Sequence, residues 1–270
     1  KGSSYQELID ALCSTVSYRE TVTLTLPEGW NSFQMAKAAA EAGLCTEEEY
    51  LAAANAIDYD FDWMKDISTD PDKLTVLEGF LYPETYSFYT DATARDIVTT
   101  QLREFEKKVL TEENKTALKD SGFTLEEWVI FASIVQKESA SVEEMYNVSS
   151  VFHNRLNNKW NFPRLESDAT VLYVLRHESG EKITLTADDL KYDTPYNTYM
   201  YEGLPPGPIA NPSASAMLAA LSPQTTNYYY FVANKGKTYF SETKAQHDAY
   251  IEEFRNETAE QQTTGDVPQN

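Results

Sequence analysis

The sequence predicts an α+β fold, in which a small module of strands and helices precedes a larger mixed α/β domain. Three observations predict it. Segments with strand-like alternation lie near both ends of the chain, capped apolar segments typical of helices lie between them, and a long loop rich in Pro, Gly, Asn and Tyr interrupts the second half. We place the small module at residues 18–92, the larger domain at 93–256 and a flexible, polar tail at 257–270.

The small module is expected to begin with a strand at residues 21–26, TVTLTL, where β-branched and apolar residues alternate. After a Pro-Glu-Gly-Trp turn, Asn31 or Ser32 can cap a helix that ends near Ala42. Thr46 can open a second helix, because the acidic residues that follow it suit the positive end of the helix dipole. The order strand–helix–helix is therefore predicted for the first half of the module.

Three further segments complete the first part of the chain. Residues 5–17 are expected to form a short helix. Residues 58–73 are polar and rich in turn formers, which predicts a surface insertion. Residues 77–89, LEGFLYPETYSFY, form an aromatic-rich extended segment that could pair with the first strand and close the module.

The larger domain is expected to be mainly helical. Thr124 followed by Glu127 fits a capping box ahead of an apolar helix that ends near Ser139. Residues 193–212 form a long loop whose tyrosines suit packing or binding. Further helices are predicted at residues 93–120, 143–157, 169–176, 186–190, 213–221 and 243–255, and a β-hairpin at residues 226–241.

Composition excludes several classes of function. The 270 residues carry a formal net charge of −21, which argues against nucleic-acid binding, because a phosphate backbone needs clustered Lys and Arg. The longest apolar run, Trp128 to Val135, is much shorter than the ~18 residues of a membrane span. The two cysteines, Cys13 and Cys45, are far apart in sequence. They could form a single disulfide, and their spacing does not fit a metal site. No Gly-rich phosphate loop or GxSxG nucleophile turn occurs.

The segment ASIVQKESA, residues 132–140, ends an apolar helix with the carboxylic acid of Glu138. At ~100° per helical residue, Glu138 lies within roughly 20° of Phe131 and 40° of Ile134, so it belongs to the apolar face. Its neighbour Lys137 points elsewhere and is not an automatic partner. Desolvation favours the protonated form of such a carboxyl group, and a retained proton is what general acid catalysis needs. The alternative is a frayed helix end with Glu138 in water or in a salt bridge.

Other side chains could complete a catalytic site, and each has a structural alternative. Glu166 or Asp168 could supply the second carboxylate of a glycosidase, although Asp168 could equally cap the helix that follows it. Asn154 and Arg155 could clamp a substrate or could support neighbouring polar groups. The tyrosine-rich loop at residues 193–212 offers ring faces and hydroxyls suited to sugars, or else packs into the core.

Six segments together resemble the endolytic murein transglycosylase family (MltG-type, YceG-like). They run in the family's order and cover most of residues 20–255. The segments are LEGFLYPETY (77–86), ASIVQKESA (132–140), VFHNRL (151–156), SDATVLYVL (167–175), YNTYMYEGLPPGPIANPSASAMLAAL (196–221) and YYFVANKGKTYFSETKAQHDAY (229–250).

The resemblance implies an enzyme that needs no cofactor and cuts peptidoglycan glycan strands internally, on the outer face of the cytoplasmic membrane. It implies that Glu138 is the catalytic acid and base, which leaves a 1,6-anhydro-MurNAc end. The family carries one N-terminal transmembrane anchor; the sequence lacks it, so we interpret the chain as the ectodomain of a single-pass membrane protein. The implied partners are glycan strands and, as a candidate class, peptidoglycan synthases.

The resemblance also assigns roles to the modules and to further residues. Residues 18–92 resemble a LysM-like, glycan-holding module, and residues 93–256 the transglycosylase domain. Two positions depart from the family pattern: Gln136 replaces the first acid of Glu-Lys-Glu, and Ala169 replaces the proline of Asp-Pro. The residues predicted to line or support the glycan groove are Asn154, Arg155, Asp168, Tyr196, Asn197, Thr198 and Tyr199.

Two other functions stay open at this point. A muramidase-type hydrolase would use Glu138 as the acid and Asp168 as the base or nucleophile, and would leave a reducing MurNAc end. A non-catalytic glycan-binding or scaffolding protein would lose nothing when Glu138 is replaced by Gln.

Overall fold

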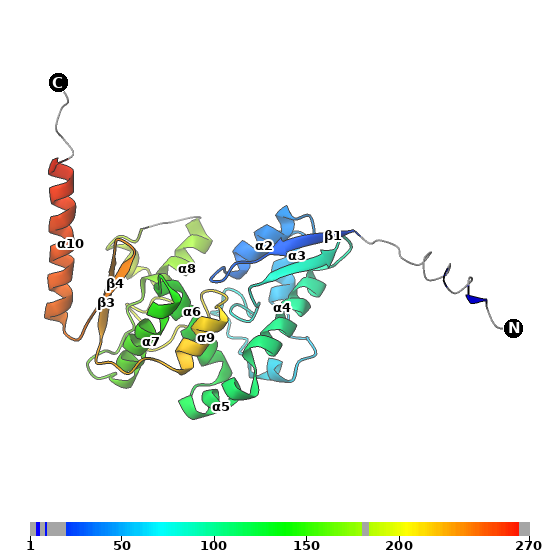
Figure 1. Cartoon of the computed structure of the whole chain (residues 1–270), viewed down its shortest axis with the longest axis horizontal. Coiled ribbons are helices and arrows are strands. Elements are labelled where there is room, and N and C mark those ends of the chain that lie inside the picture. Colours follow the sequence, from blue (N-terminus) through cyan, green and yellow to red (C-terminus); the bar gives the residue numbers. More distant parts are fainter. Residues whose placement is uncertain (1–3, 6–8, 10–19, 180–183, 265–270) are drawn as a thin grey trace, which may run out of the picture.

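The computed structural model describes residues 20–179 and 184–264, together with residues 4, 5 and 9 (Figure 1). The fold is mixed α+β and mostly helical, with two separate two-stranded antiparallel sheets among the described residues. Cys13 and the helix predicted at residues 5–17, apart from residues 5 and 9, lie outside the part of the chain that is described. No helix in the described ranges combines the length and the apolar character needed to cross a membrane.

The small module has the predicted order of elements. β1 (Thr21–Thr25) pairs antiparallel with β2 (Thr85–Tyr89), so the first and last segments of the module meet in one sheet. Between them lie α2 (Ser32–Glu41), α3 (Glu47–Ala54) and the 3-10 helix η1 (Asp62–Asp66). α2 and α3 begin at capping boxes that Asn31 and Thr46 form with the third residue of each helix. The likeness of this module to a LysM domain stays a prediction.

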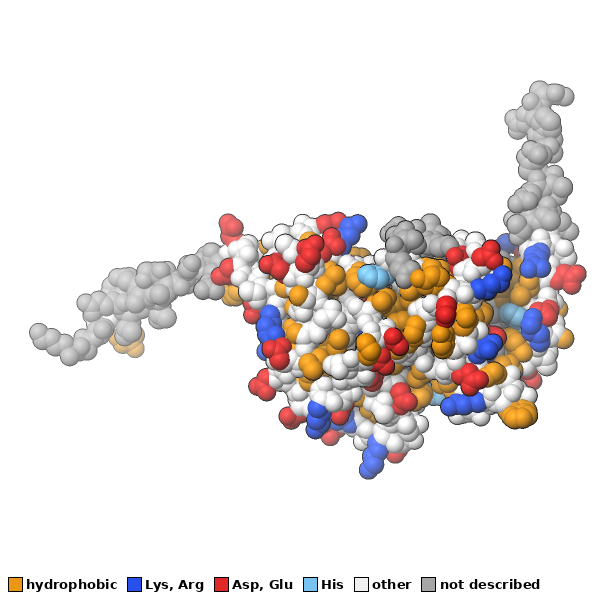
Figure 2. Space-filling view, turned by 180° about the vertical axis from the view of Figure 1, so that it is seen from behind, with side chains coloured by type: hydrophobic (Ala, Val, Ile, Leu, Met, Phe, Trp, Pro, Cys, Tyr) orange, Lys and Arg blue, Asp and Glu red, His pale blue; other side chains and the backbone are white. Residues whose placement is uncertain are grey.

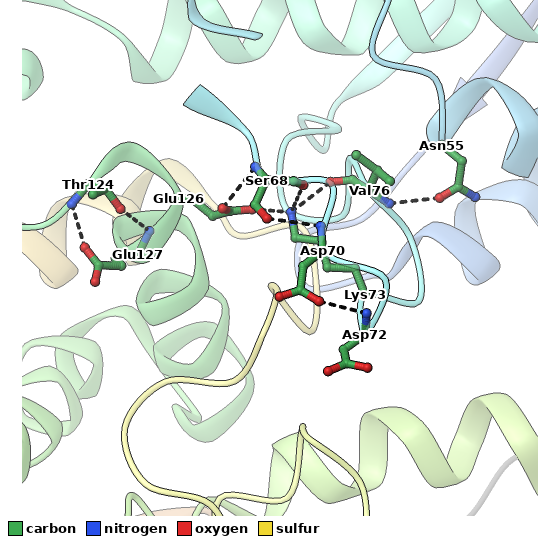
Figure 3. A network of polar contacts seen from close by, with 9 residues as sticks. All are labelled: Asn55, Ser68, Asp70, Asp72, Lys73, Val76, Thr124, Glu126 and Glu127. Carbon is green, nitrogen blue, oxygen red and sulfur yellow. Dashed lines mark hydrogen bonds and ion pairs between the residues drawn. The ribbon is translucent and has the colours of Figure 1, made fainter. Parts of the chain in front are cut away.

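The polar segment at residues 58–73 is more than the surface insertion that its composition predicts. Trp63 is only 7% exposed and packs in the core. The side chain of Lys73 is fully buried, forms an ion pair with Glu126 at the start of α6, and donates a hydrogen bond to the Ser68 carbonyl at 2.8 Å (Figure 3). A few buried groups therefore fix a segment whose average composition is that of a surface loop.

The larger domain is mainly helical, as predicted, with some differences. The single helix predicted at residues 93–120 is two helices, Ala94–Val109 and Glu112–Ser121, because Thr111 caps a new helix start, and the helix predicted at residues 186–190 is only a 3-10 turn at Asp189–Lys191. α6 begins at the predicted capping box of Thr124 and ends at Glu138. The last helix is longer than predicted, because it ends at Thr264, so residues 257–264 of the proposed tail are helical. The elements are α4 (Ala94–Val109), α5 (Glu112–Ser121), α6 (Leu125–Glu138), α7 (Val142–Asn157), α8 (Asp168–Ser179), η2 (Asp189–Lys191), α9 (Ala214–Leu221), β3 (Tyr230–Asn234), β4 (Lys237–Ser241) and α10 (Lys244–Thr264).

One continuous apolar core runs through both parts of the chain, and α6 lies inside it. Trp128 of α6 is fully buried and its indole N–H donates to the Met217 carbonyl of α9 at 2.8 Å. Gly79 lets the loop before β2 approach α6: a Cβ there would lie 2.5 Å from a Val129 methyl carbon and 2.7 Å from Pro208. The division of the chain at residue 92 therefore stays a prediction, since the packing continues across it.

Candidate active site

A cleft of about 240 Å³ lies where the start of α2 meets the end of α6 and the first turns of α8. Both parts of the chain contribute to it. One wall is formed by Gly29, Asn31 and Gln34, and the opposite side by Lys137, Glu138, Asp168, Ala169, Tyr173 and Arg176. The rings of Phe33 in α2 and His177 in α8 stack at 4.2 Å, so the two walls also touch directly.

Glu138 is the last residue of α6, and the chain leaves the helix at Ser139. One oxygen of its carboxyl group, Oε1, accepts a hydrogen bond from the Ser167 hydroxyl at 2.5 Å and one from the Ala169 amide at 3.2 Å. None of the ion pairs formed among the described residues involves Glu138. The helix end is thus ordered, and its carboxyl group is held by neutral donors.

Burial raises the pKa of Glu138 above its ordinary value. The two hydrogen bonds from Ser167 and Ala169 act in the opposite direction, and the nearby charge of Asp168 adds to the rise. A carboxyl group that keeps its proton to higher pH and lines an open cleft can act as a general acid. The geometry therefore suits proton donation to a group bound in the cleft.

Asp168 lines the same cleft, but it does not cap α8 as predicted. It is the first residue of the helix, not the residue before it. Its carboxylate accepts a hydrogen bond from the Tyr199 hydroxyl at 2.6 Å. Asp168 and Tyr199 are thus brought together beside Glu138.

The other predicted residues of the tyrosine-rich loop lie behind the cleft. Thr198 is buried, and its hydroxyl oxygen accepts the Ser167 amide proton at 2.9 Å, so it holds the residue that contacts Glu138. Asn197 is buried and fastens its own loop, because its side-chain amide donates to the Leu190 and Tyr192 carbonyls. The ring of the buried Tyr196 packs on the cleft residue Tyr173 at 5.2 Å.

Asn154 and Arg155 lie in α7 and do not line the cleft. The Asn154 amide donates to the Thr226 and Tyr228 carbonyls at 2.9 Å each. The Arg155 guanidinium donates to the Leu165 carbonyl at 2.8 Å. These contacts tie α7 to the chain before β3 and to the loop that leads to Ser167, which favours the supporting role over the clamp.

Three groups around the cleft were not predicted from the sequence. Ser167 bonds Glu138, and the Lys137 ammonium donates to the Gly29 carbonyl at 3.1 Å across the cleft. A third group, the buried carboxyl of Glu78, contacts Tyr173. The only signal in the sequence was that each of these residues lies within a motif. Their roles depend on partners far away in sequence, so they could not be predicted. Within the described ranges, no cluster of three His, Cys, Asp or Glu side chains is arranged to hold a metal ion.

Comparisons with known proteins show the family of the chain. The model of the YceG-like family matches residues 1–253. The chain belongs to the YceG-like family. A crystal structure of a YceG-like protein from Listeria monocytogenes is 31% identical, with a TM-score of 0.75, and the match covers 91% of this chain and 80% of that one.

Two relatives named endolytic murein transglycosylase give the same family assignment. The protein from Bacillus subtilis is 31% identical over 267 residues, which are 94% of this chain and 71% of the relative. The protein from Streptococcus pneumoniae is 30% identical over 252 residues, which are 87% of this chain and 45% of the relative. The chain thus spans less than half the length of the streptococcal protein.

Proposed function

We propose that the chain is an endolytic lytic transglycosylase that cleaves the bond between MurNAc and GlcNAc within peptidoglycan glycan strands. The observation that carries the proposal is the carboxyl group of Glu138, which is half-buried at a helix end, accepts hydrogen bonds from neutral donors and lines a cleft. The names of the relatives at about 30% identity support the same reaction class.

One carboxyl group suffices for both proton transfers of this reaction. Protonated Glu138 gives its proton to the glycosidic oxygen, and the bond from that oxygen to C1 of MurNAc breaks. The Glu138 carboxylate then takes the proton of the MurNAc 6-hydroxyl while that oxygen forms a new bond to C1. The products are a GlcNAc 4-hydroxyl and a 1,6-anhydro-MurNAc end, with no water added and the carboxyl group again protonated.

The neighbouring groups suit an uncleaved strand that lies across the cleft. The Tyr199 hydroxyl and Asp168 together offer a donor–acceptor pair beside Glu138, suited to sugar hydroxyls. Lys137 and Arg176 place two cations on a cleft wall in a chain of net charge −21, which suits the carboxylates carried by muramyl substituents.

The setting of the enzyme is proposed on the same basis. The catalytic part is placed on the outer face of the cytoplasmic membrane, where its substrate is made, with the protein held by a single membrane anchor. The module at residues 18–92 is proposed to hold glycan as a LysM-like module does, and peptidoglycan synthases remain the predicted protein partners.

Mass spectrometry of uncrosslinked glycan strands tests the proposal. The strands are incubated with the wild type and with Glu138→Gln, and folding of both is checked by circular dichroism. Anhydro-MurNAc ends made by the wild type and absent with the variant are the expected result.

The same experiment separates the two rivals. Reducing MurNAc ends would support hydrolysis with Asp168, which shares the cleft, as the base or nucleophile, and Asp168→Asn would then lose as much activity as Glu138→Gln. Binding of strands without cleavage by either folded protein, also when the chain is anchored to vesicles, would support a glycan-binding protein.

A further inference from the structure

A second carboxyl group, that of Glu78, lies fully buried behind the cleft. Both of its oxygens accept hydrogen bonds from the Ser32 amide, at 3.1 and 3.0 Å. Its Oε1 also accepts from the Asn211 side-chain amide at 2.8 Å, and its Oε2 from the Tyr173 hydroxyl at 3.0 Å. Three segments far apart in sequence therefore donate to one carboxyl group.

These donors belong to the two walls of the cleft. Ser32 is the first residue of α2. Gly29 and Asn31, in the segment just before α2, belong to one wall of the cleft. Tyr173 in α8 lines the opposite wall. Asn211 strengthens the link, because its amide also donates to the Trp30 carbonyl at 3.1 Å. Glu78 is thus the point at which both walls are fastened.

Burying a carboxyl group costs desolvation free energy, so a neutral side chain would join these segments at a lower cost than Glu78 does. No Lys or Arg forms an ion pair with Glu78 among the described residues, and the three groups that donate hydrogen bonds to it are neutral. Burial raises the pKa of Glu78 to about 7, against the opposing effect of its hydrogen bonds. Buried acids with this property cluster at functional sites.

We propose that Glu78 is a positioning residue of the cleft, whose carboxylate fixes the spacing of α2 and α8 so that a bound strand meets Glu138. The inference rests on the proposed function. Glu78 itself touches no substrate in this scheme and acts through Tyr173 and the start of α2. A misplacement of about 1 Å is enough to slow an oriented reaction about 10²-fold.

The ionised form of Glu78 is the one that accepts hydrogen bonds from Ser32, Asn211 and Tyr173 together. A carboxylate can accept from all three donors, whereas a protonated carboxyl group must itself donate and loses an acceptor position. The titratable groups that act on or feel its charge are Tyr173 in α8, Tyr50 in α3, Tyr196 in the long loop and Lys137 in α6. Of these groups and Glu78, the Glu78 carboxyl is the one whose pKa is placed at about 7.

The test compares Glu78→Gln, Tyr173→Phe and the double variant, with Tyr86→Phe as the matched control. Tyr86 is also a buried tyrosine whose hydroxyl donates a hydrogen bond, to the Tyr82 carbonyl, but it does not line the cleft. Initial rates of strand cleavage are measured from pH 5 to 9, which gives kcat and KM at each pH.

We expect Glu78→Gln and Tyr173→Phe each to lower kcat about tenfold, with no further loss in the double variant, because both break the same link. The wild type should lose activity as pH falls through about 7, and Glu78→Gln should lack this acidic limb. Tyr86→Phe should keep both the rate and the limb.

Three outcomes overturn the inference: an acidic limb that survives in Glu78→Gln, additive losses in the double variant, or an equal loss in Tyr86→Phe. If Glu78→Gln fails to fold, the test rests on Tyr173→Phe, which keeps the buried acid. A kcat for Tyr173→Phe equal to that of Tyr86→Phe would then overturn the inference. A wild type that cleaves no strand overturns the proposed function, whereas an active wild type with an unchanged pH profile in Glu78→Gln overturns only the role of Glu78.

Discussion

Helix α6 carries Glu126 near its start and Glu138 at its end, and the two carboxyl groups have different kinds of partner. Near its start, Glu126 forms an ion pair with the buried Lys73 and accepts the Ser68 amide proton at 3.1 Å. At its last residue, Glu138 has two hydrogen-bond donors in the described part of the chain, the Ser167 hydroxyl and the Ala169 amide. Glu126 has a cation as its partner, whereas Glu138 has none at ion-pair distance among residues 20–179 and 184–264.

The position on the helix increases this difference. The N-terminal end of a helix favours negative charge, and the C-terminal end disfavours it. Glu126 is therefore stabilised as an anion that anchors a loop, while Glu138 is held where the neutral acid is favoured. The comparison shows that, within one buried helix, the partner and the helix end distinguish a structural carboxylate from a candidate catalytic acid.

Replacing Glu138 by Gln should have the largest effect, and should lower activity without lowering stability. We expect the rate of strand cleavage to fall about 10³-fold, because general acid–base catalysis contributes 10²–10⁴-fold. Stability should not fall at alkaline pH. A raised pKa in the folded state means that the native protein binds this proton more tightly, so ionisation costs stability as pH rises above about 4.3.

Two measurements check this prediction. Kinetics at the pH optimum should show the loss in kcat, and thermal unfolding at pH 8 should give a Tm for Glu138→Gln at or above that of the wild type. A variant that is active within tenfold of the wild type would remove Glu138 from the mechanism.

Replacing Lys73 by Met should produce the opposite pattern. Glu126 would stay partly buried without its cation, and loss of one partner of a buried pair costs about 3–5 kcal/mol of unfolding free energy. Urea unfolding measures the loss. For the protein that remains folded, kcat should equal that of the wild type, since Lys73 does not line the cleft. A change below 1 kcal/mol would show that the pair contributes little.

Replacing Ser167 by Ala should have an intermediate effect at the other end of α6. The Ser167 hydroxyl lowers the pKa of Glu138, so its removal should raise that pKa and move the alkaline limb of the activity profile to higher pH. We expect kcat to fall about tenfold, because Glu138 also loses a hydrogen bond that orients it. Ser121→Ala, which removes an exposed hydroxyl bonded to the Leu118 carbonyl, is the control and should leave the profile unchanged.

The smallest effect is expected where an ion pair is exposed. Lys107 pairs with Glu104 at 3.1 Å on α4, and 66% of the Lys107 side chain is exposed. Such pairs contribute at most about 0.5 kcal/mol, so Lys107→Ala should shift the urea midpoint barely beyond error. A loss as large as that of Lys73→Met would contradict the view that burial of the pair, rather than its existence, sets its contribution.

Figure 2 shows acidic and basic side chains scattered over one face of the molecule. Ion pairs on such a surface are expected to contribute as little to the free energy of unfolding as the pair of Lys107 and Glu104.

The sequence was informative where the determinants are local. Thr46 and Thr124 predicted the starts of their helices, because a cap and its partner lie three residues apart. The helical angle placed Glu138 on the apolar face, as the burial of Phe131 beside it supports. The α+β pattern and the hairpin were predictable for the same reason.

Groups joined over long distances in sequence could not be predicted in this way. Ser167 lies 29 residues from Glu138, and Asn211 lies 133 residues from Glu78. Lys73 was hidden because its burial depends on α6 and not on its polar neighbours. Asp168 looked like a cap because caps and first-turn acids occur at adjacent positions and have the same composition.

The contacts of Asn211 have a consequence for synthesis of the chain. Its backbone pairs with Gly29 and Trp30, and its side-chain oxygen accepts the amide protons of Gly79 and Leu81. The residues of β1 and α2 leave the ribosome long before Asn211 does. The wall of the cleft beside α2 therefore lacks its hydrogen bonds to Asn211 until late in synthesis. We therefore expect nascent chains that end before residue 211 to hold no finished cleft, and the capacity for cleavage to arise late, when nearly four-fifths of these 270 residues have been made.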